Sequence, residues 1–426
     1  MRGWSAVVRG SIMCGVLSLV LASAASAQLA NSAWPKFQHD AQNTGLGTDV
    51  GPQGPNPQVA WSYRGDSRFR SIASVGPNGL VVGNGKRPMT SLDPATGLEL
   101  WNANILPVLG KGKTGLADRS QPAIAADGTS YQGARDNNLW SVASDGEVNW
   151  FYKVLHDGDV TTSPNVHPDG TIYMGSEALG SGWFFALNPD GTVKGFTVLG
   201  GSLKNVSPAI SSDGTRVFVS IKREAIALNA DDLSEIWRCT IANKGFGSRT
   251  PNFSPVVYND GVQDQAVYFG SREGLWAFDP NADETYDCTP KWLFVPPNPV
   301  GAKKHEEIKS APAIGPDGTV YLGASKSKKS STFYALDPVD GSIKWQHNHQ
   351  EKGRYINTNA AIGADGTAYV GFGRLLYAFD GQGDGNGGSI VKWTMLVPGK
   401  FETGPAIGGP GVLYAAVGKT LFKITD

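Results

Sequence analysis

Few residue patterns in this chain of 426 residues could perform chemistry by themselves. His347 and His349 stand two positions apart, and alternate residues of a strand share a face, so the pair could form half of a metal site. No third ligand follows at a fixed spacing, and we favour a solvated strand end. The sequence has no Gly-x-Ser-x-Gly, no His-Glu-x-x-His and no phosphate-binding loop. We therefore predict no catalytic residues and no metal site, and we favour a protein that is not an enzyme.

The first 27 residues are typical of a secretory signal. Arg2 and Arg9 precede an apolar run over residues 12–21, and a small-x-small pattern ends at Ala27. Cys14 does not match a lipoprotein signal, because the apolar run continues past it. No later stretch reaches the ~18 apolar residues of a membrane helix. The sequence thus predicts a periplasmic or extracellular protein that does not span the membrane.

Export would place the two remaining cysteines, Cys239 and Cys288, in an oxidising compartment. Such a compartment permits a disulfide between them. Their spacing alone equally allows two separate thiols, so both alternatives stay open.

A repeat organises the rest of the chain, and its clearest copy runs from Ser310 to Trp345. This copy reads as four short strands. The first two are joined by Asp317-Gly318, because glycine adopts a positive φ easily in a hairpin turn. The last two are joined by a turn that ends at Gly341. Repeats of this length with four strands are typical of propeller blades.

One large aromatic residue marks the expected fourth strand of each copy, at intervals of 40 to 55 residues. Once-per-blade spacing indicates packing against the neighbouring blade rather than a ligand-stacking platform. A phenylalanine takes the place of tryptophan in one copy. The eight positions are Trp61, Trp101, Trp150, Phe196, Trp237, Trp292, Trp345 and Trp393.

The two ends of the repeat array complement each other. The last copy, residues 404–424, stops after its third strand, while residues 58–63 form an isolated fourth strand. Pairing them would close the ring and remove exposed edges. We predict an all-β fold, an eight-bladed β-propeller of four-stranded antiparallel blades closed by its terminal strands. The expected segments are a signal at 1–27, an N-terminal extension at 28–57 and the propeller at 58–426, in a monomer.

Three segments resemble the pyrroloquinoline-quinone (PQQ) repeat family, as found in secreted bacterial PQQ-like propellers. Two of them look like the tryptophan-docking motif of that family, and the third looks like its N-terminal segment. They are Ala335–Trp345, Leu92–Trp101 and Trp34–Gly45. The family includes quinoprotein alcohol and glucose dehydrogenases and non-enzymatic members such as the outer-membrane assembly factor BamB, so the resemblance implies the fold more strongly than an activity.

The resemblance also defines an alternative function, a dehydrogenase that uses PQQ with Ca²⁺. The alcohol dehydrogenases of the family resemble one another in a pair of adjacent cysteines, which this chain lacks. It also lacks the Cys-x-x-Cys-His motif of haem attachment. No residue can be carried over as a quinone or calcium ligand, so we expect no cofactor. A further alternative is a polysaccharide lyase or hydrolase with His305, His347 or His349 as a base.

Basic and acidic residues are predicted to lie mostly on opposite faces of the disc once the loops are assigned to blades. One face of the disc carries the connections between blades and the turns between second and third strands, and we call it the connection face. It holds 27 basic and 12 acidic residues, whereas the rest of the chain after residue 27 holds 8 basic and 26 acidic. Such a field attracts anions. The overall charge of −1 argues against a nucleic-acid partner.

The leading hypothesis is therefore a non-catalytic secreted binding or scaffold propeller that engages an anionic ligand, such as an acidic protein surface or an anionic glycan. Its binding residues should fall late in the connections, where the chain enters the innermost strands. These candidates are Arg68, Arg70, Arg119, Lys204, Arg249, Lys309 and Arg354.

Overall fold

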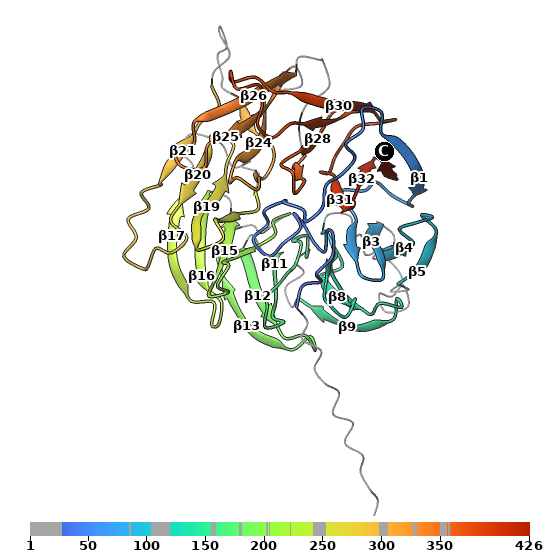
Figure 1. Cartoon of the computed structure of the whole chain (residues 1–426). Helices are drawn as coiled ribbons and strands as arrows, with labels where there is room; N and C mark the ends of the chain where they lie inside the picture. Colours follow the sequence, from blue (N-terminus) through green and yellow to red (C-terminus); the bar gives the residue numbers. More distant parts are fainter. Residues whose placement is uncertain are drawn as a thin grey trace, which may run out of the picture.

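The computed structural model confirms the eight-bladed propeller (Figure 1). It describes residues 28–84, 87–103, 120–154, 159–178, 181–201, 203, 205–221, 223–241, 253–297, 306–326, 330–349, 356 and 358–426. The expected signal at 1–27 lies outside these residues. Within the part that the structure describes, no helix has the length and apolar character to cross a membrane.

The strands follow the chain blade by blade, with the innermost strand first. Blade 1 consists of β2 (Ser74–Gly76), β3 (Gly79–Asn84), β4 (Arg87–Leu92) and β5 (Glu99–Asn102). Blade 2 consists of β6 (Ala123–Ile124), β7 (Ser130–Gly133), β8 (Asn138–Val142) and β9 (Val148–Lys153). Blade 3 consists of β10 (Asn165–Val166), β11 (Ile172–Ala178), β12 (Ser181–Leu187) and β13 (Val193–Val198). Blade 4 consists of β14 (Ala209–Ile210), β15 (Arg216–Ile221), β16 (Glu224–Asn229) and β17 (Glu235–Thr240).

The second half of the ring repeats this order. Blade 5 consists of β18 (Val256–Asn259), β19 (Asp264–Gly270), β20 (Leu275–Phe278) and β21 (Trp292–Phe294). Blade 6 consists of β22 (Glu307–Ile308), β23 (Ala313–Ile314), β24 (Val320–Lys326), β25 (Ser330–Leu336) and β26 (Ile343–His349). Blade 7 consists of β27 (Ala361–Ile362), β28 (Ala368–Phe372), β29 (Leu375–Phe379) and β30 (Val391–Leu396). Blade 8 consists of β31 (Ala406–Gly409), β32 (Val412–Val417), β33 (Thr420–Thr425) and β1 (Gln58–Arg64).

The termini close the ring as predicted. Strand β1 pairs antiparallel with β33, from Gln58 opposite Thr425 to Arg64 opposite Thr420. Blade 6 departs from the expected four strands, because its inner edge is divided into β22 and β23, which both pair with β24. The chain makes one antiparallel pass along β24, and its pairing is interrupted between Ile308 and Ala313, where the register shifts.

Local sequence explains the blade hairpins. At the turn before β24, Gly318 has a φ of 80°. Asp317 accepts a hydrogen bond from the backbone of Thr319 at 3.1 Å. Lys344 of the fourth strand reaches back to Asp317 at 2.9 Å and to the Thr319 hydroxyl at 2.6 Å. This Asp–Thr–Lys arrangement recurs in blades 3 and 7, so it links the first hairpin to the fourth strand within one blade.

The tryptophans of the fourth strands connect neighbouring blades. Five of them donate a hydrogen bond from Nε1 to a backbone carbonyl of the next blade, at 2.7 to 3.2 Å. A sixth, Trp393 of blade 7, donates at 2.9 Å to the carbonyl of Pro52, in the extension that precedes β1. The indole ring lies over a glycine of the accepting turn: a Cβ at Gly341, where φ is 73°, would lie 2.6 Å from the Trp292 ring. Trp61, Trp101 and Trp150 are half-buried. Trp237, Trp292, Trp345 and Trp393 are buried.

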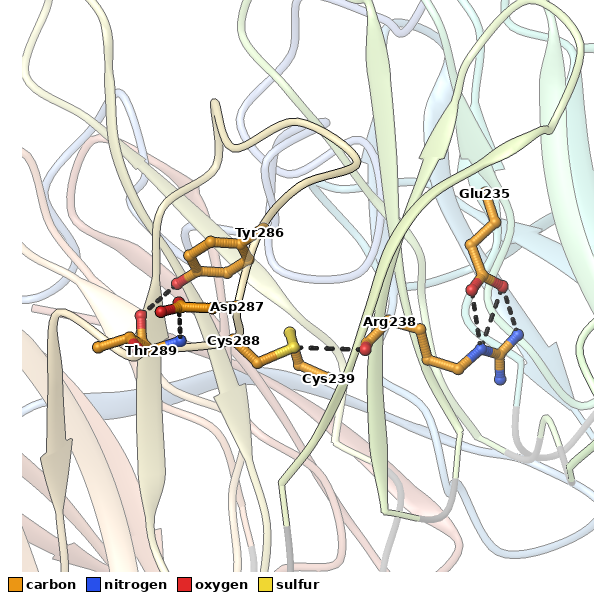
Figure 2. The surroundings of a disulfide bond; sticks show 7 residues. All are labelled: Glu235, Arg238, Cys239, Tyr286, Asp287, Cys288 and Thr289. Carbon is orange, nitrogen blue, oxygen red and sulfur yellow. Dashed lines mark hydrogen bonds and ion pairs between the residues drawn. A yellow bond between two sulfur atoms is a disulfide. The ribbon is translucent and has the colours of Figure 1, made fainter.

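Two consecutive junctions lack this contact. Between blades 3 and 4, Phe196 has no donor and is 57% exposed. Between blades 4 and 5, Trp237 is buried, but its Nε1 has no hydrogen-bond partner among the residues that the structure describes. Here a disulfide joins Cys239 of β17 to Cys288, in the segment between β20 and β21, with the Cα atoms 5.4 Å apart (Figure 2). The disulfide thus ties together two blades at a junction without the tryptophan hydrogen bond.

The disulfide joins positions 49 residues apart in the sequence. We expect the Cys239→Ser, Cys288→Ser double variant to lose about 2–4 kcal/mol of unfolding free energy, because the open chain gains entropy when unfolded. Urea unfolding with and without a thiol reductant measures this. The reductant should lower the midpoint of the wild type but leave the double variant unchanged. Equal midpoints for wild type and variant would contradict a stabilising link.

Candidate functional site

The N-terminal segment, residues 28–51, occupies the centre of the ring and forms the floor of the site. It is the dark blue chain inside the propeller in Figure 1. Its carbonyls accept hydrogen bonds at 2.8–2.9 Å from the innermost strands of six blades, through the backbone N–H groups of Val75, Ile124, Ile210, Val257, Ile314 and Ile362. In blade 3 the side chain of Asn165 donates to the carbonyl of Ala41, and in blade 8 the backbone of Gly411 donates to the carbonyl of Val50, both at 2.8 Å. The segment therefore contacts all eight blades, and it satisfies inner-edge N–H groups that have no further strand to pair with.

A buried lysine holds this segment in shape. The Lys36 ammonium donates to the carbonyls of Phe37 at 2.8 Å and Asp40 at 2.7 Å, and to the side chain of Asn43. Asn43 in turn donates to three carbonyls of blades 4 and 5. Burial lowers the pKa of Lys36 to about 7, although the nearby Asp40 charge opposes the shift. All three donors of the ammonium are thus used inside the channel.

A cavity of about 140 Å³ opens above this floor. Its wall comes from segments that lead from an outer strand into the next innermost strand, so it lies on the connection face. Trp34, Phe37 and Gln38 of the N-terminal segment line its base. The wall is formed mainly by hydroxyl and amide side chains, with one arginine and one glutamate, and includes Arg70, Ser71, Gln121, Asn205, Asn359, Glu402 and Thr403.

Four residues that line the cavity each carry a buried polar atom without a hydrogen-bond partner in the described part of the protein. Trp34 Nε1, Gln38 Oε1, Ser71 Oγ and Thr403 Oγ1 are buried and have no hydrogen-bond partner among the residues that the structure describes. These residues are only 2–7% exposed. A buried polar atom without a partner costs about 1–3 kcal/mol. These four atoms have almost no accessible surface, so they lie behind the surface of the cavity and other atoms of the same residues line it.

The structure places three of the seven predicted binding residues. Arg70 lines the cavity. Arg68 forms an ion pair with Glu402 at 3.0 Å, and Lys309 forms one with Glu307 at 2.6 Å. The other four, Arg119, Lys204, Arg249 and Arg354, lie outside the described residues. The excess of positive charge on this face accordingly stays a prediction.

The histidine pair lies between blades and not at a solvated strand end, so that expectation was wrong. His347 and His349 project from β26 into the aromatic side chains of blade 7, and His349 is only 6% exposed. His347 Nδ1 lies 2.9 Å from the Ser389 hydroxyl. Strand β26 extends far enough for its last residues to be covered by β28 and β29. Neither histidine lines the cavity, and His305 lies outside the described residues.

Burial and the neighbouring His349 lower the pKa of His347 to about 4. Its ordinary value is about 6.5, so the folded protein favours the neutral ring. The resulting stabilisation is complete above pH 6.5 and is lost as the pH falls towards 4. We expect His347→Gln to remove about 2 kcal/mol of this pH dependence, after allowance for partial exposure. Urea unfolding of both proteins at pH 7 and pH 4 tests it, and parallel pH profiles would contradict it.

Sequence reasoning missed most of the cavity. Trp34 and Gln38 belong to the segment Trp34–Gly45, which was noticed only for its resemblance to a family segment. Ser71 and Thr403 lie in the connections shortly before the innermost strands β2 and β31, where hydroxyl residues recur in several blades. That recurrence was the available signal, but it did not show which hydroxyls would lack a partner.

The described residues around the cavity fit PQQ with Ca²⁺ poorly. PQQ is a tricarboxylate, and the cavity presents one described arginine together with the carboxylate of Glu402. Calcium takes six to eight oxygen ligands. Among the described residues, no three His, Cys, Asp or Glu side chains gather as a metal site would need. The base of the cavity is moreover already occupied by the N-terminal segment.

The fold and the blocked channel define the class of this protein as an eight-bladed propeller with its candidate site on the connection face. No family model matches the sequence, and no curated protein is detectably similar to it. Solved structures share the fold. The quinohemoprotein alcohol dehydrogenase of Comamonas testosteroni has a TM-score of 0.69 at 13% identity, covering 92% of this chain and 80% of the other.

Two further structures show the range of proteins with this fold. A europium-containing methanol dehydrogenase has a TM-score of 0.68 at 12% identity, covering 92% of this chain and 98% of its own. BamB from Moraxella catarrhalis has a TM-score of 0.62 at 14% identity, covering 87% of this chain and all of its own. The chain thus has the propeller fold of the PQQ-type proteins, and at these identities the likeness concerns the fold alone.

Proposed function

We propose that this protein is a non-catalytic secreted binding propeller whose mouth cavity receives an anionic ligand. The observation that supports this most is a cavity on the connection face whose wall consists mainly of hydroxyl and amide side chains and includes one arginine. A site that only binds needs such hydrogen-bonding groups and no titratable pair placed for acid–base chemistry. The N-terminal segment closes the channel below, so a ligand reaches the cavity only from the connection face.

Charge supports an anion at this entrance. Arg70 lines the cavity, and its planar guanidinium can bind a carboxylate or sulfate through two hydrogen bonds. The Glu402 carboxylate forms an ion pair with Arg68 at 3.0 Å, which weakens its repulsion of an anion. The sequence places further basic residues in the neighbouring connections, where they would attract anions to the face. The Cys239–Cys288 disulfide agrees with a periplasmic or extracellular location.

Binding of acidic and neutral oligosaccharides and of PQQ with Ca²⁺, measured by calorimetry at increasing salt, tests the proposal. We expect acidic oligosaccharides to bind, with an affinity that falls as salt rises. Arg70→Ala should weaken binding about tenfold. Arg64→Ala removes the same charge from an exposed position on β1 that does not line the cavity, so it should leave binding unchanged.

Two outcomes would overturn the proposal. An affinity that changes neither with salt concentration nor in the Arg70→Ala variant would contradict an anionic ligand. Stoichiometric PQQ binding with the absorbance of a bound quinone, accompanied by alcohol oxidation, would establish the dehydrogenase alternative instead.

A further inference from the structure

Removal of the predicted signal would make Gln28 the first residue of the secreted protein. The small-x-small pattern ends at Ala27, so cleavage there converts the backbone nitrogen of Gln28 into a free α-amino group. An α-amino group has an ordinary pKa of about 7.7–8.0, so part of it is unprotonated and nucleophilic near neutral pH. Attack of this amine on the side-chain amide of the same residue closes a five-membered lactam ring.

The structure leaves the reacting groups of Gln28 accessible. The residue is exposed, and neither its backbone nitrogen nor its side-chain amide has a hydrogen-bond partner among the described residues. The two residues that follow are progressively covered, since Leu29 is half-buried and Ala30 is only 5% exposed. The accessible end of the described chain is therefore Gln28 itself, and no contact to a described residue holds its amide away from the amine.

The carbonyl of Gln28 anchors this end of the N-terminal segment. The backbone N–H of Ala126 in blade 2 donates to it at 2.7 Å. Two residues later, Ala30 donates from its backbone to the carbonyl of Ile124 at 2.8 Å. A lactam forms from the nitrogen and the side chain of Gln28 only, so its carbonyl can still accept from Ala126. The cyclised residue thus fits the observed packing without a change in these hydrogen bonds.

We propose that Gln28 of the secreted protein is converted to pyroglutamate. The α-amino nitrogen attacks Cδ of the side chain, the N–Cδ bond forms, and the Cδ–Nε2 bond breaks. Ammonia leaves with a proton taken from the amine, so the step consumes no oxidant, reductant or second substrate. The product has no free amine and no terminal positive charge. This modification site goes beyond the proposed function and does not depend on a ligand in the cavity.

The blocked end would protect the segment that fills the channel. Proteolysis concentrates at chain termini, and an aminopeptidase needs a free α-amino group. Removal of residues 28–30 would take away the hydrogen bonds with Ala126 and Ile124, which hold the start of the segment to blade 2. Because the N-terminal segment contacts all eight blades, cyclisation of its first residue would preserve part of the core of the ring.

Intact mass spectrometry of the full chain, expressed with its own signal and collected after secretion, tests the proposal. We expect a mass about 17 Da, one ammonia, below that of residues 28–426 with the disulfide formed. Edman degradation should give no sequence until pyroglutamyl aminopeptidase has removed one residue, and should then begin at Leu29. A secreted chain that starts at Gln28 with a free amine and the unchanged mass would overturn the proposal, as would a chain that starts at another residue.

Variants test the chemistry and the protection separately. Gln28→Ala removes the reacting amide and should abolish the loss of ammonia. Asn31→Ala removes another exposed side-chain amide of the same segment and should keep that loss. A broad-specificity aminopeptidase should shorten Gln28→Ala at least about tenfold faster than the wild type. Equal rates would overturn the protective role.

The same variant separates this inference from the proposed function. Calorimetry with acidic oligosaccharides should give the same affinity for Gln28→Ala and the wild type, because the reacting groups of Gln28 do not line the cavity. If no acidic oligosaccharide binds but the mass loss is present, the proposed function fails and pyroglutamate stands. If binding depends on Arg70 and the amine of Gln28 is free, the proposed function stands and pyroglutamate fails.

Discussion

A chain that begins at residue 52 is expected to aggregate, whereas a chain that begins at residue 28 should be soluble and folded. Removing residues 28–51 exposes six backbone N–H groups of the innermost strands that the segment pairs. Because water can reach these groups, each lost hydrogen bond costs about 0.5–1.5 kcal/mol, and the six together amount to a large part of the 5–15 kcal/mol stability of a typical domain. Size-exclusion chromatography and thermal circular dichroism of both chains measure the effect.

A point variant tests the same segment without removing it. Lys36→Met leaves three acceptors and the Asp40 carboxylate without their buried cation. We therefore expect the free energy of unfolding to fall by about 3 kcal/mol. Lys400→Met removes an exposed lysine and should change stability by less than about 0.5 kcal/mol. Should the chain from residue 52 melt at the temperature of the longer chain, the N-terminal segment would be an appendage and not part of the core.

Trp345→Ala is expected to cost about 3–5 kcal/mol of unfolding free energy. The side chain is 1% exposed, and its ring packs against Tyr321, Phe333 and Phe379. Its Nε1 donates to the Gly381 carbonyl of blade 7 at 2.9 Å. Truncation therefore removes a large apolar contact and the hydrogen bond between two blades. Urea unfolding, followed by tryptophan fluorescence, gives the free energy.

The chain supplies a matched control at the equivalent position of blade 3. Phe196→Ala removes an aromatic side chain from the same place in the repeat, but this side chain is 57% exposed and has no contact of the tryptophan type. We expect it to cost less than about 1 kcal/mol. Similar losses for Phe196→Ala and Trp345→Ala would show that the contact between blades contributes little.

The number of blades and their closure could be predicted because that information is local and repeated. Turns such as Asp317-Gly318 specify hairpins within a few residues, and five of the fourth-strand tryptophans donate to the turn of the next copy. The missing strand at one end and the extra strand at the other then leave one way to close the ring. The repeat pattern did not reveal β22, the additional inner strand of blade 6, because no turn motif precedes it.

The cavity and its chemistry depended on the tertiary structure. Trp34 and Gln38 are far in sequence from Ser71 and Thr403, and they meet because the N-terminal segment turns inside the channel. Whether a hydroxyl lacks a partner depends on every neighbouring atom, which spacing along a chain does not encode. The burial of His349 between blades and the pairing of Cys239 with Cys288 have the same origin, because each required two different blades to be placed side by side. The repeating sequence alone determined the ring, while the packing of a non-repeating segment inside it decided where a ligand can bind.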